Sequence, residues 1–141
     1  TQRPARPRSS KEHKPLILAA EDVESNYTLL RATLSKRYRL EWAKDGIEAV
    51  RMNEELHPDL IMMDMKMPNL DGLQATAIIH EVSDVPIIAL TAFAFDSDRV
   101  KALEAGCVDF MTKPFTPERL YAMIEKYLPE ADNGEDQITN V

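Results

Sequence analysis

The feature that most constrains the fold is a short apolar run that ends on an aspartate. Residues 60–63 read Leu-Ile-Met-Met, Asp64 follows, and Pro68 stops the run. An apolar run of this length between turn residues is typical of a strand buried on both faces of a parallel sheet. A carboxylate there costs free energy unless it is paired, bound to a metal or placed at the open edge of the sheet. The surroundings of Asp64 therefore decide what the chain can do.

Apolar strands and amphipathic helices alternate along the rest of the chain. Strands are predicted at residues 16–20, 39–43, 59–64, 85–90 and 108–111, and helices at residues 24–36, 46–56, 72–81 and 117–128. A further helix, the fourth, is predicted to follow a cap among residues 96–98 and to end at residues 105–106. This alternation predicts an α/β protein with a parallel sheet, helices on both faces and right-handed crossovers. The doubly wound strand order 2-1-3-4-5 fits, and it places a ligand site beyond the carboxyl ends of the strands.

Short polar residues mark the predicted helix starts. Asp45 is followed three residues later by Glu48, which is the spacing of a capping box. Asp71 precedes the third helix, and Thr116-Pro117 opens the fifth, since proline is favoured at the first helical position. The fourth helix has three cap candidates, Asp96, Ser97 and Asp98.

Composition indicates one folded domain between two charged ends. Hydrophobic residues make up 44% and charged residues 29% of the 141, as in ordinary soluble proteins. The net charge of −7 divides into +4 for residues 1–14, −7 for residues 15–128 and −4 for residues 129–141. We therefore expect a flexible basic lead-in at 1–14, a domain at 15–128 and a flexible acidic tail at 129–141.

Several classes of function are disfavoured by these totals. An acidic domain repels phosphates, which argues against direct nucleic-acid binding. No apolar run reaches the ~18–20 residues that span a bilayer, and no apolar signal region is present, so we expect no membrane contact and a cytoplasmic location. The lone Cys107 excludes an internal disulfide and is expected to be a small buried hydrophobe. Core filling is the expected role of Met62, Met63, Met65 and Met67.

Ionisable and hydroxyl side chains gather at the predicted strand ends. In chain order they are Glu21, Asp22, Asp64, Thr91 and Lys113. Because the carboxyl ends of parallel strands share one edge, these groups are expected in one crevice. Three close carboxylates repel one another unless a cation is present, and Mg²⁺ prefers the oxygen ligands that they offer.

Such a set suits the transfer of a phosphoryl group to Asp64. With Mg²⁺ bound, this carboxylate would act as a nucleophile toward phosphorus and form an aspartyl phosphate. Phosphoryl transfer depends mainly on positioning and charge stabilisation. The metal would neutralise one phosphoryl oxygen, Lys113 a second, and Thr91 would hydrogen-bond the third.

Four motifs together resemble the receiver domain of the two-component response-regulator family. They are Glu21-Asp22, the run from Met63 to Gly72, Leu90-Thr91-Ala92 and Lys113-Pro114-Phe115. The resemblance covers residues 14–128 and implies the receiver fold, which is a flavodoxin-like five-stranded α/β fold. It also implies Mg²⁺-dependent phosphorylation of an aspartate by a phosphohistidine.

The resemblance assigns roles to the matching positions. Asp64 matches the phosphoacceptor, Thr91 the switch hydroxyl and Lys113 the phosphate-binding lysine. Phe110 matches an aromatic switch position, although core packing explains it equally well. The peptide bond between Lys113 and Pro114 is expected to be cis. The implied metal ligands are Glu21, Asp22, Asp64 and the backbone carbonyl of Lys66.

Partners follow from the same resemblance. The phosphoryl donor would be a phosphohistidine on a histidine kinase or phosphotransfer domain. A second copy of the chain would pack on the face formed by the fourth helix, fifth strand and fifth helix. Asn26 and residues 72–76 resemble receivers fused to hybrid sensor histidine kinases, so we expect that origin. The domain itself would promote only its own phosphorylation and dephosphorylation.

Three alternatives stay open on the residues alone. A stand-alone single-domain response regulator would look nearly the same over this stretch. A degenerate receiver that acts only as an interaction module is disfavoured, because all the key residues are present. A flavin-nucleotide-binding, flavodoxin-like protein would need a loop rich in serine, threonine and glycine after the first strand, whereas Glu21-Asp22 there would repel the flavin phosphate.

Overall fold

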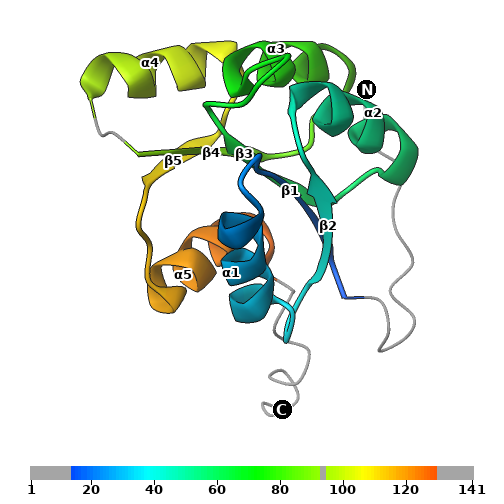
Figure 1. Ribbon diagram of the computed structural model, residues 1–141, viewed down its shortest axis with the longest axis vertical. Helices are drawn as coiled ribbons and strands as arrows, with labels where there is room; N and C mark the ends of the chain where they lie inside the picture. The colour runs from blue at the N-terminus through cyan, green and yellow to red at the C-terminus, as the bar shows by residue number, and fades with distance from the viewer. Residues whose placement is uncertain (1–13, 93–94, 130–141) are drawn as a thin grey trace.

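The computed structural model of the protein describes residues 14–92 and 95–129, in which strands and helices alternate (Figure 1). The strands are β1 (Leu16–Ala20), β2 (Arg39–Ala43), β3 (Leu60–Asp64), β4 (Ile87–Thr91) and β5 (Asp109–Thr112). The helices are α1 (Glu24–Leu34), α2 (Gly46–Leu56), α3 (Gly72–Val82), α4 (Asp96–Ala105) and α5 (Pro117–Tyr127). None of these described helices is long and apolar enough to cross a membrane. Apart from Lys14 and Pro129, the predicted lead-in and tail lie outside the described residues.

The strands form one parallel sheet in the predicted order, β2-β1-β3-β4-β5. β1 lies between β2 and β3, so that Ala20 is opposite both Ala43 and Met63. At the far side of the sheet, Thr91 at the end of β4 is opposite Thr112 on β5. Successive strands are added on one side of β1 for β2 and on the other side from β3 onward, and doubly wound sheets form their ligand sites at this switch between β1 and β3.

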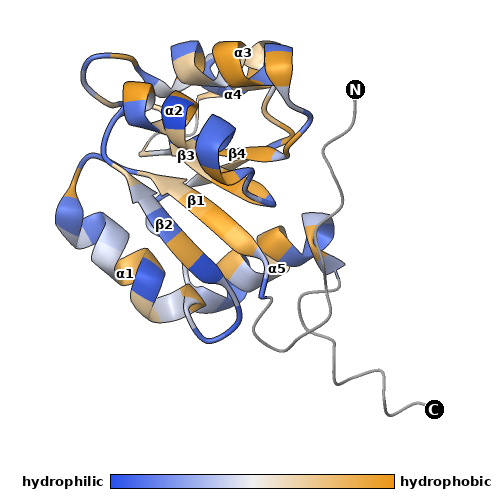
Figure 2. Ribbon diagram, turned by 90° about the vertical axis from the view of Figure 1, so that its right-hand side faces the viewer, coloured by the Kyte–Doolittle hydropathy of each residue, from blue (hydrophilic) through white to orange (hydrophobic). Residues whose placement is uncertain are grey.

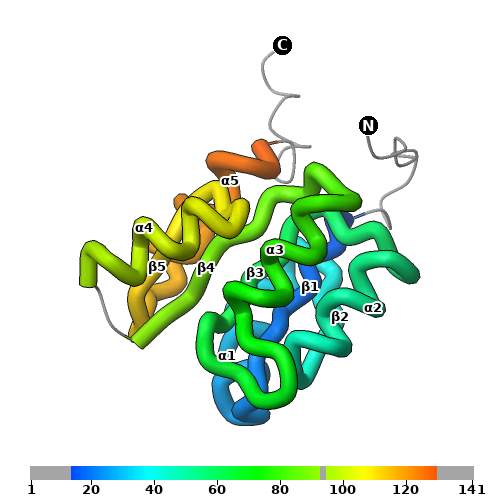
Figure 3. Tube along the Cα trace, turned by 90° about the horizontal axis from the view of Figure 1, so that it is seen from above, coloured from blue at the N-terminus to red at the C-terminus, as the bar shows by residue number. Residues whose placement is uncertain are grey.

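Three helices cover one face of the sheet and two cover the other. Figures 1 and 3 show α2, α3 and α4 over one face, with α1 and α5 on the opposite face. Because alternate strand residues point to opposite faces, Leu18 and Met63 pack beneath α2, α3 and α4, whereas Ile17 and Met62 pack beneath α1 and α5. Figure 2 shows the mainly hydrophobic β1 inside this sandwich. Each fully buried side chain of this size stabilises the fold by about 1.5–3 kcal/mol.

The sulfur-containing side chains are packing residues, as predicted. Met62 and Met63 are fully buried, Met67 is 9% exposed, and Met65 packs against the cluster beneath α2, α3 and α4. Cys107 is buried beside Thr76, and burial raises the pKa of its thiol to about 11. The thiol is therefore protonated at neutral pH and is a poor nucleophile.

Three of the predicted helix caps are confirmed. Asp45 Oδ1 accepts a hydrogen bond from the Glu48 N–H at 2.8 Å and caps α2. Asp71 caps α3 in a capping box with Gln74, and the Thr116 hydroxyl caps α5. These bonds satisfy N–H groups that have no partner within the first helical turn. Glu48 differs from the prediction, since its carboxylate accepts from the N–H of the residue before the cap, Lys44.

The predicted capping of α4 is wrong. The helix begins at Asp96, so the candidates Asp96, Ser97 and Asp98 lie inside its first turn. Phe95 occupies the N-cap position and makes no side-chain cap hydrogen bond, while its carbonyl accepts from the Asp98 N–H. The two aspartates instead place negative charge at the positive end of the helix dipole.

Some element boundaries shift by one or two residues from the prediction. α1 ends at Leu34 rather than at residue 36, β3 begins at Leu60 rather than at Asp59, and β5 is one residue later than expected. β4 begins after Pro86, because proline has no N–H to join the ladder. β4 ends on Thr91, so this residue belongs to the strand rather than to the loop after it.

Candidate functional site

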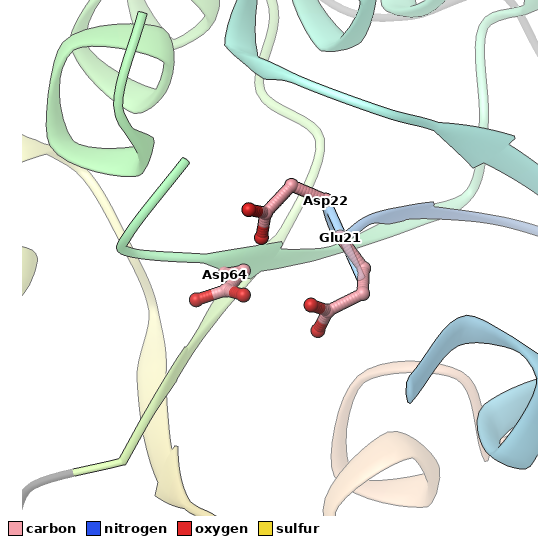
Figure 4. Close-up of side chains that lie close together, drawn as sticks. All are labelled: Glu21, Asp22 and Asp64. Atoms are coloured by element: carbon pink, nitrogen blue, oxygen red, sulfur yellow. The ribbon is translucent and has the colours of Figure 1, made fainter. Parts of the chain in front are cut away.

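The carboxyl edge of the sheet brings the predicted acidic residues together. Glu21 and Asp22 directly follow β1, and Asp64 is the last residue of β3. Figure 4 shows their three side chains turned into a shared space. One carboxylate oxygen from each lies within 4.8 Å of the others. The adjacent register of β1 and β3 is the cause, because it brings both strand ends to the same level of the sheet.

Glu21 is the most buried of the three, with 1% of its surface exposed. Its Oε1 accepts a hydrogen bond from Lys113 Nζ at 3.1 Å. Its Oε2 accepts from the Val23 N–H and from Asn26 Nδ2, both at 3.2 Å. Three donors hold this buried carboxylate in one orientation, so the Glu21 side chain has a fixed position in the site.

Asp64 is 5% exposed and faces two donors. Its Oδ1 accepts from the Lys66 N–H and its Oδ2 from Lys113 Nζ, each at 3.1 Å. Burial raises the pKa of this carboxyl to about 6; the Lys66 N–H and the Lys113 charge oppose that rise, and the nearby Glu21 adds to it. The Asp64 carboxylate is therefore held by one neutral and one charged donor, while burial opposes its ionisation.

Lys113 bridges the two buried carboxylates from the segment after β5. Burial alone would lower the pKa of its ammonium, but the Asp64 and Glu21 carboxylates outweigh burial and raise it. The backbone N–H of Lys113 also donates to the Thr91 carbonyl oxygen at 2.7 Å, which fixes the backbone at Lys113 beside the end of β4. The Lys113–Pro114 peptide bond is cis, as the resemblance implied.

The acidic group fits a divalent cation. Three carboxylates lie together with one ammonium, so negative charge remains uncompensated in the site. Asp22 is exposed, which leaves one side of the cluster open to water. Mg²⁺ binds one or two carboxylates and keeps several waters, so this combination of buried and open ligands suits it. The ligand role of the Lys66 carbonyl stays a prediction.

The two proposed switch residues lie on the neighbouring strands β4 and β5. Thr91 is 5% exposed and lines a cleft at the sheet edge together with Asp22 and Lys66. Phe110 is half-buried on β5, opposite Ala89, and packs against the core beneath α2, α3 and α4. This position agrees with both interpretations of Phe110 from the sequence, an aromatic switch residue and a core-packing residue. Its part in a switch therefore remains a prediction.

Two contacts around the site are not indicated by the sequence patterns. The indole Nε1–H of Trp42 donates to the Glu21 carbonyl oxygen at 2.7 Å. Asn69 Nδ2 donates to Asp45 Oδ2 at 2.7 Å. The one signal in the sequence was a tryptophan on the short second strand, and nothing in the strand pattern says which carbonyl it reaches.

Known proteins resemble this chain along most of its length. A model of the response regulator receiver domain matches residues 17–125. Hybrid signal transduction histidine kinase I of Dictyostelium discoideum is 40% identical over 129 residues, covering 81% of this chain and 7% of that protein. The receiver domain of a sensor histidine kinase from Pseudomonas aeruginosa, solved with magnesium in its active site cleft, is 39% identical with a TM-score of 0.76. That match covers 82% of this chain and 98% of the solved one.

A third comparison involves a complex. The receiver domain of a response regulator from Saccharomyces cerevisiae, solved with a histidine phosphotransfer signalling protein, is 31% identical with a TM-score of 0.78. It covers 86% of this chain and 94% of the solved one. The chain spans 7% of the Dictyostelium relative, about half the length of several other curated relatives it matches, and 97% of others. A family match over most of the folded residues, with solved receivers above 30% identity covered almost end to end, places this chain in the response regulator receiver domain family of two-component signalling.

Proposed function

We propose that Asp64 accepts a phosphoryl group from a phosphohistidine in a reaction that requires Mg²⁺. The observation that carries this proposal is the setting of Asp64 at the end of a buried strand, with one oxygen on the Lys66 N–H and the other on Lys113 Nζ. The solved relatives with magnesium and with a histidine phosphotransfer protein support it. The donor would be a histidine kinase or a phosphotransfer domain.

The chemistry is a transfer without oxidation or reduction. An oxygen of the Asp64 carboxylate attacks phosphorus, a P–O bond forms, and the P–N bond to the donor imidazole breaks with its electron pair left on nitrogen. The attacking group must be ionised, and burial opposes ionisation, so the Lys113 charge and the Lys66 N–H favour the reactive form. Bound Mg²⁺ would supply the positive charge that offsets the carboxylates and the phosphoryl oxygens.

Each remaining residue has a separate task in this proposal. Glu21, Asp22, Asp64 and the Lys66 carbonyl would hold the metal. Lys113 would move from the Asp64 carboxylate to a phosphoryl oxygen, a small displacement since its Nζ already lies 3.1 Å from Asp64 Oδ2. Thr91 would turn its hydroxyl toward the phosphoryl group, and Phe110 would follow as the signal passes to β5. The signal is then a two-state shift biased by charge at the site.

Acetyl phosphate offers a direct test on the folded chain. Wild type, Asp64→Asn and Asp71→Asn are incubated with acetyl phosphate, with and without Mg²⁺, and separated on a phosphate-affinity gel. Asp71→Asn is the matched control, because it makes the same substitution at a helix cap in the loop that follows Asp64. A Mg²⁺-dependent shifted band is expected for wild type and for Asp71→Asn, and none for Asp64→Asn.

Two results would contradict the assignment. Labelling of Asp64→Asn at another residue would remove Asp64 as the acceptor. No labelling of wild type, either by acetyl phosphate or by phosphohistidine donors, would favour the interaction-module alternative.

The domain is further proposed to come from a hybrid sensor histidine kinase. The Dictyostelium relative is a hybrid histidine kinase and the Pseudomonas receiver belongs to a sensor histidine kinase, which supports that origin. Asn26 donates to the buried Glu21, so the residue that suggested this origin has a structural role at the site. Sequencing the complete gene decides the question: a stand-alone regulator would carry no kinase region on the same reading frame.

A second copy of the chain is the proposed partner for the α4–β5–α5 face. Exposed apolar side chains on α4 and just before β5, namely Val100, Leu103 and Val108, support the proposal. Sedimentation of the chain with and without a beryllofluoride phosphoryl analogue tests it. A mass that stays monomeric in both states would argue against this dimer.

A further inference from the structure

The single tryptophan of the chain contacts the acidic loop through its indole nitrogen. Trp42 lies on the edge strand β2, and its Nε1–H donates to the Glu21 carbonyl oxygen at 2.7 Å. The Glu21 N–H donates to the Ala43 carbonyl oxygen at 2.9 Å. Both backbone polar groups of Glu21 are therefore held by neighbouring residues of β2.

The Glu21 carbonyl lies beyond the end of the β1–β2 ladder. The last paired residues of the two strands are Ala20 and Ala43, so no ladder bond is available to this carbonyl. A backbone carbonyl at a buried residue needs a donor, and the indole N–H supplies one. Trp42 thus replaces the next bond of the ladder and allows the chain to turn away at Asp22.

The same carbonyl belongs to the peptide unit that leads into Asp22. A peptide unit is planar, so fixing its C=O direction also fixes the direction of the bond from its nitrogen to the next Cα. Asp22 is the exposed member of the acidic cluster, and Figure 4 shows its carboxylate beside that of Asp64. The orientation of the peptide before Asp22 therefore bears directly on where its carboxylate points.

Trp42 is itself held in place. Its ring stacks on Tyr27 of α1 with centroids 4.9 Å apart and planes 3° from parallel. Lys44 Nζ lies 5.2 Å from the ring centroid on the same strand end. Aromatic stacking and a nearby cation each favour one orientation of the indole. Any rotation of the ring would break the stack and the bond to Glu21 together.

We propose that Trp42 is a positioning residue for the divalent cation, because its indole N–H holds the Glu21–Asp22 peptide so that the Asp22 carboxylate faces that of Asp64. This inference rests on the proposed metal site. The simpler alternative is that Trp42 only covers the gap between α1 and β2. These two roles of Trp42 depend on different groups. Positioning of the Asp22 carboxylate requires the indole N–H, whereas covering the space between α1 and β2 requires only the ring.

Trp42→Phe separates these readings, since phenylalanine keeps an aromatic ring for the Tyr27 stack and has no N–H donor. MgCl₂ is titrated into ¹⁵N-labelled wild type, Trp42→Phe and Tyr121→Phe, and the Mg²⁺ dissociation constant is read from the backbone amide shifts near Asp22 and Asp64. Tyr121→Phe is the matched control, because it removes another side-chain donor to a backbone carbonyl, that of Thr33 on α1. Wild type also offers a second signal, the one indole N–H resonance of the chain.

The expected result is a dissociation constant raised about three- to tenfold in Trp42→Phe, the size associated with one lost hydrogen bond. Tyr121→Phe should keep the wild-type constant. The indole resonance of wild type should move along the same binding curve as the amides of the acidic loop. Tyr27→Leu, which keeps the donor and removes its stacking partner, should raise the constant by a smaller factor.

Other outcomes have distinct meanings. If Trp42→Phe binds Mg²⁺ with the same dissociation constant as wild type, the proposal is wrong and Trp42 only covers the space between α1 and β2. An indole resonance that stays still while the loop amides move would overturn it as well, and this readout holds even if Trp42→Phe does not fold. If the backbone amide shifts of wild type do not saturate with Mg²⁺, the proposed metal site is wrong, and so is the positioning role of Trp42.

Discussion

Asn69 donates a hydrogen bond from its Nδ2 to Asp45 Oδ2 across 2.7 Å and so ties the loop after β3 to the start of α2. The other carboxylate oxygen of Asp45 caps α2 by accepting from the Glu48 N–H. These two bonds, the cap first, lower the pKa of the Asp45 carboxyl. The same loop carries Lys66, whose carbonyl is the predicted ligand of the metal. The contact between Asn69 and Asp45 therefore helps to hold that carbonyl in position.

Substitutions of Asn69 test this anchor. The residue has a φ of 70°, in the left-handed region that glycine tolerates and alanine does not. Asn69→Gly should lower the free energy of unfolding by about 0.5–1.5 kcal/mol, the loss of one hydrogen bond. Asn69→Ala should cost about 1 kcal/mol more because of its backbone strain. Urea denaturation measures the free energy of unfolding of both variants. Equal values would contradict the predicted backbone strain in Asn69→Ala.

A methyl group at Gly72 should disturb the acceptor strand. A Cβ there would lie 2.2 Å from the Asp64 carbonyl oxygen and 2.7 Å from the Met65 Cα, both backbone atoms that cannot turn aside. Gly72→Ala is expected to destabilise the chain by about 1–3 kcal/mol or more. Thermal denaturation followed by circular dichroism measures this loss. Ser97→Ala, an exposed change in the first turn of α4, is the control and should stay within about 0.5 kcal/mol of wild type.

Magnesium should stabilise the folded chain through the acidic cluster. At about ten times its dissociation constant, a cation that binds only the folded state adds about 1.4 kcal/mol. Differential scanning calorimetry with MgCl₂ and with EDTA should therefore show a higher Tm with the metal. Asp22→Asn should lose most of this increase, while Glu81→Gln, which changes an exposed carboxylate on α3, should keep it. An Asp22→Asn protein that responds like wild type would exclude Asp22 as a ligand.

The ion pair between α5 and β5 predicts a pH dependence of stability. Burial alone would raise the pKa of Asp109, but hydrogen bonds from Lys126, Tyr127 and the Phe110 N–H outweigh it and leave the pKa lowered. A carboxyl whose pKa is lower in the folded state stabilises the fold above its unfolded pKa of about 3.9. That contribution is lost as the pH falls through the folded pKa.

Asp109→Asn should therefore be less stable than wild type by about 0.5–1 kcal/mol near pH 7, a value reduced by solvent screening of the partly exposed pair. The gap should narrow as the pH falls below about 3.9 and close only below the folded pKa of Asp109, where wild type has lost the same charge. Urea denaturation at a series of pH values from 7 downward measures it. A gap of constant size would show that the charge of Asp109 is not its source. Lys126→Met removes the cation from the same pair and should narrow the pH dependence of wild type.

Much of the fold followed from local patterns. The apolar runs at β1 and β3 are buried along their whole length, and the caps at Asp45, Asp71 and Thr116 lie where short polar residues preceded apolar periodicity. Where the local signal was ambiguous the prediction failed. Three polar residues in a row at the start of α4 each resembled a cap, and the backbone bond from Asp98 to Phe95 placed the helix start before all of them.

The sequence by itself determined the strand–helix alternation, the parallel sheet and the delivery of Glu21, Asp22, Asp64 and Lys113 to one edge, because strand direction and side-chain period depend on neighbours along the chain. The tertiary structure alone decided that Lys113 bridges two buried carboxylates, that Asn69 reaches Asp45 and that Trp42 reaches the Glu21 carbonyl. These bonds join residues at least 21 positions apart in the chain. Their partners are chosen by packing between layers, and no pattern of spacing along one element records that choice.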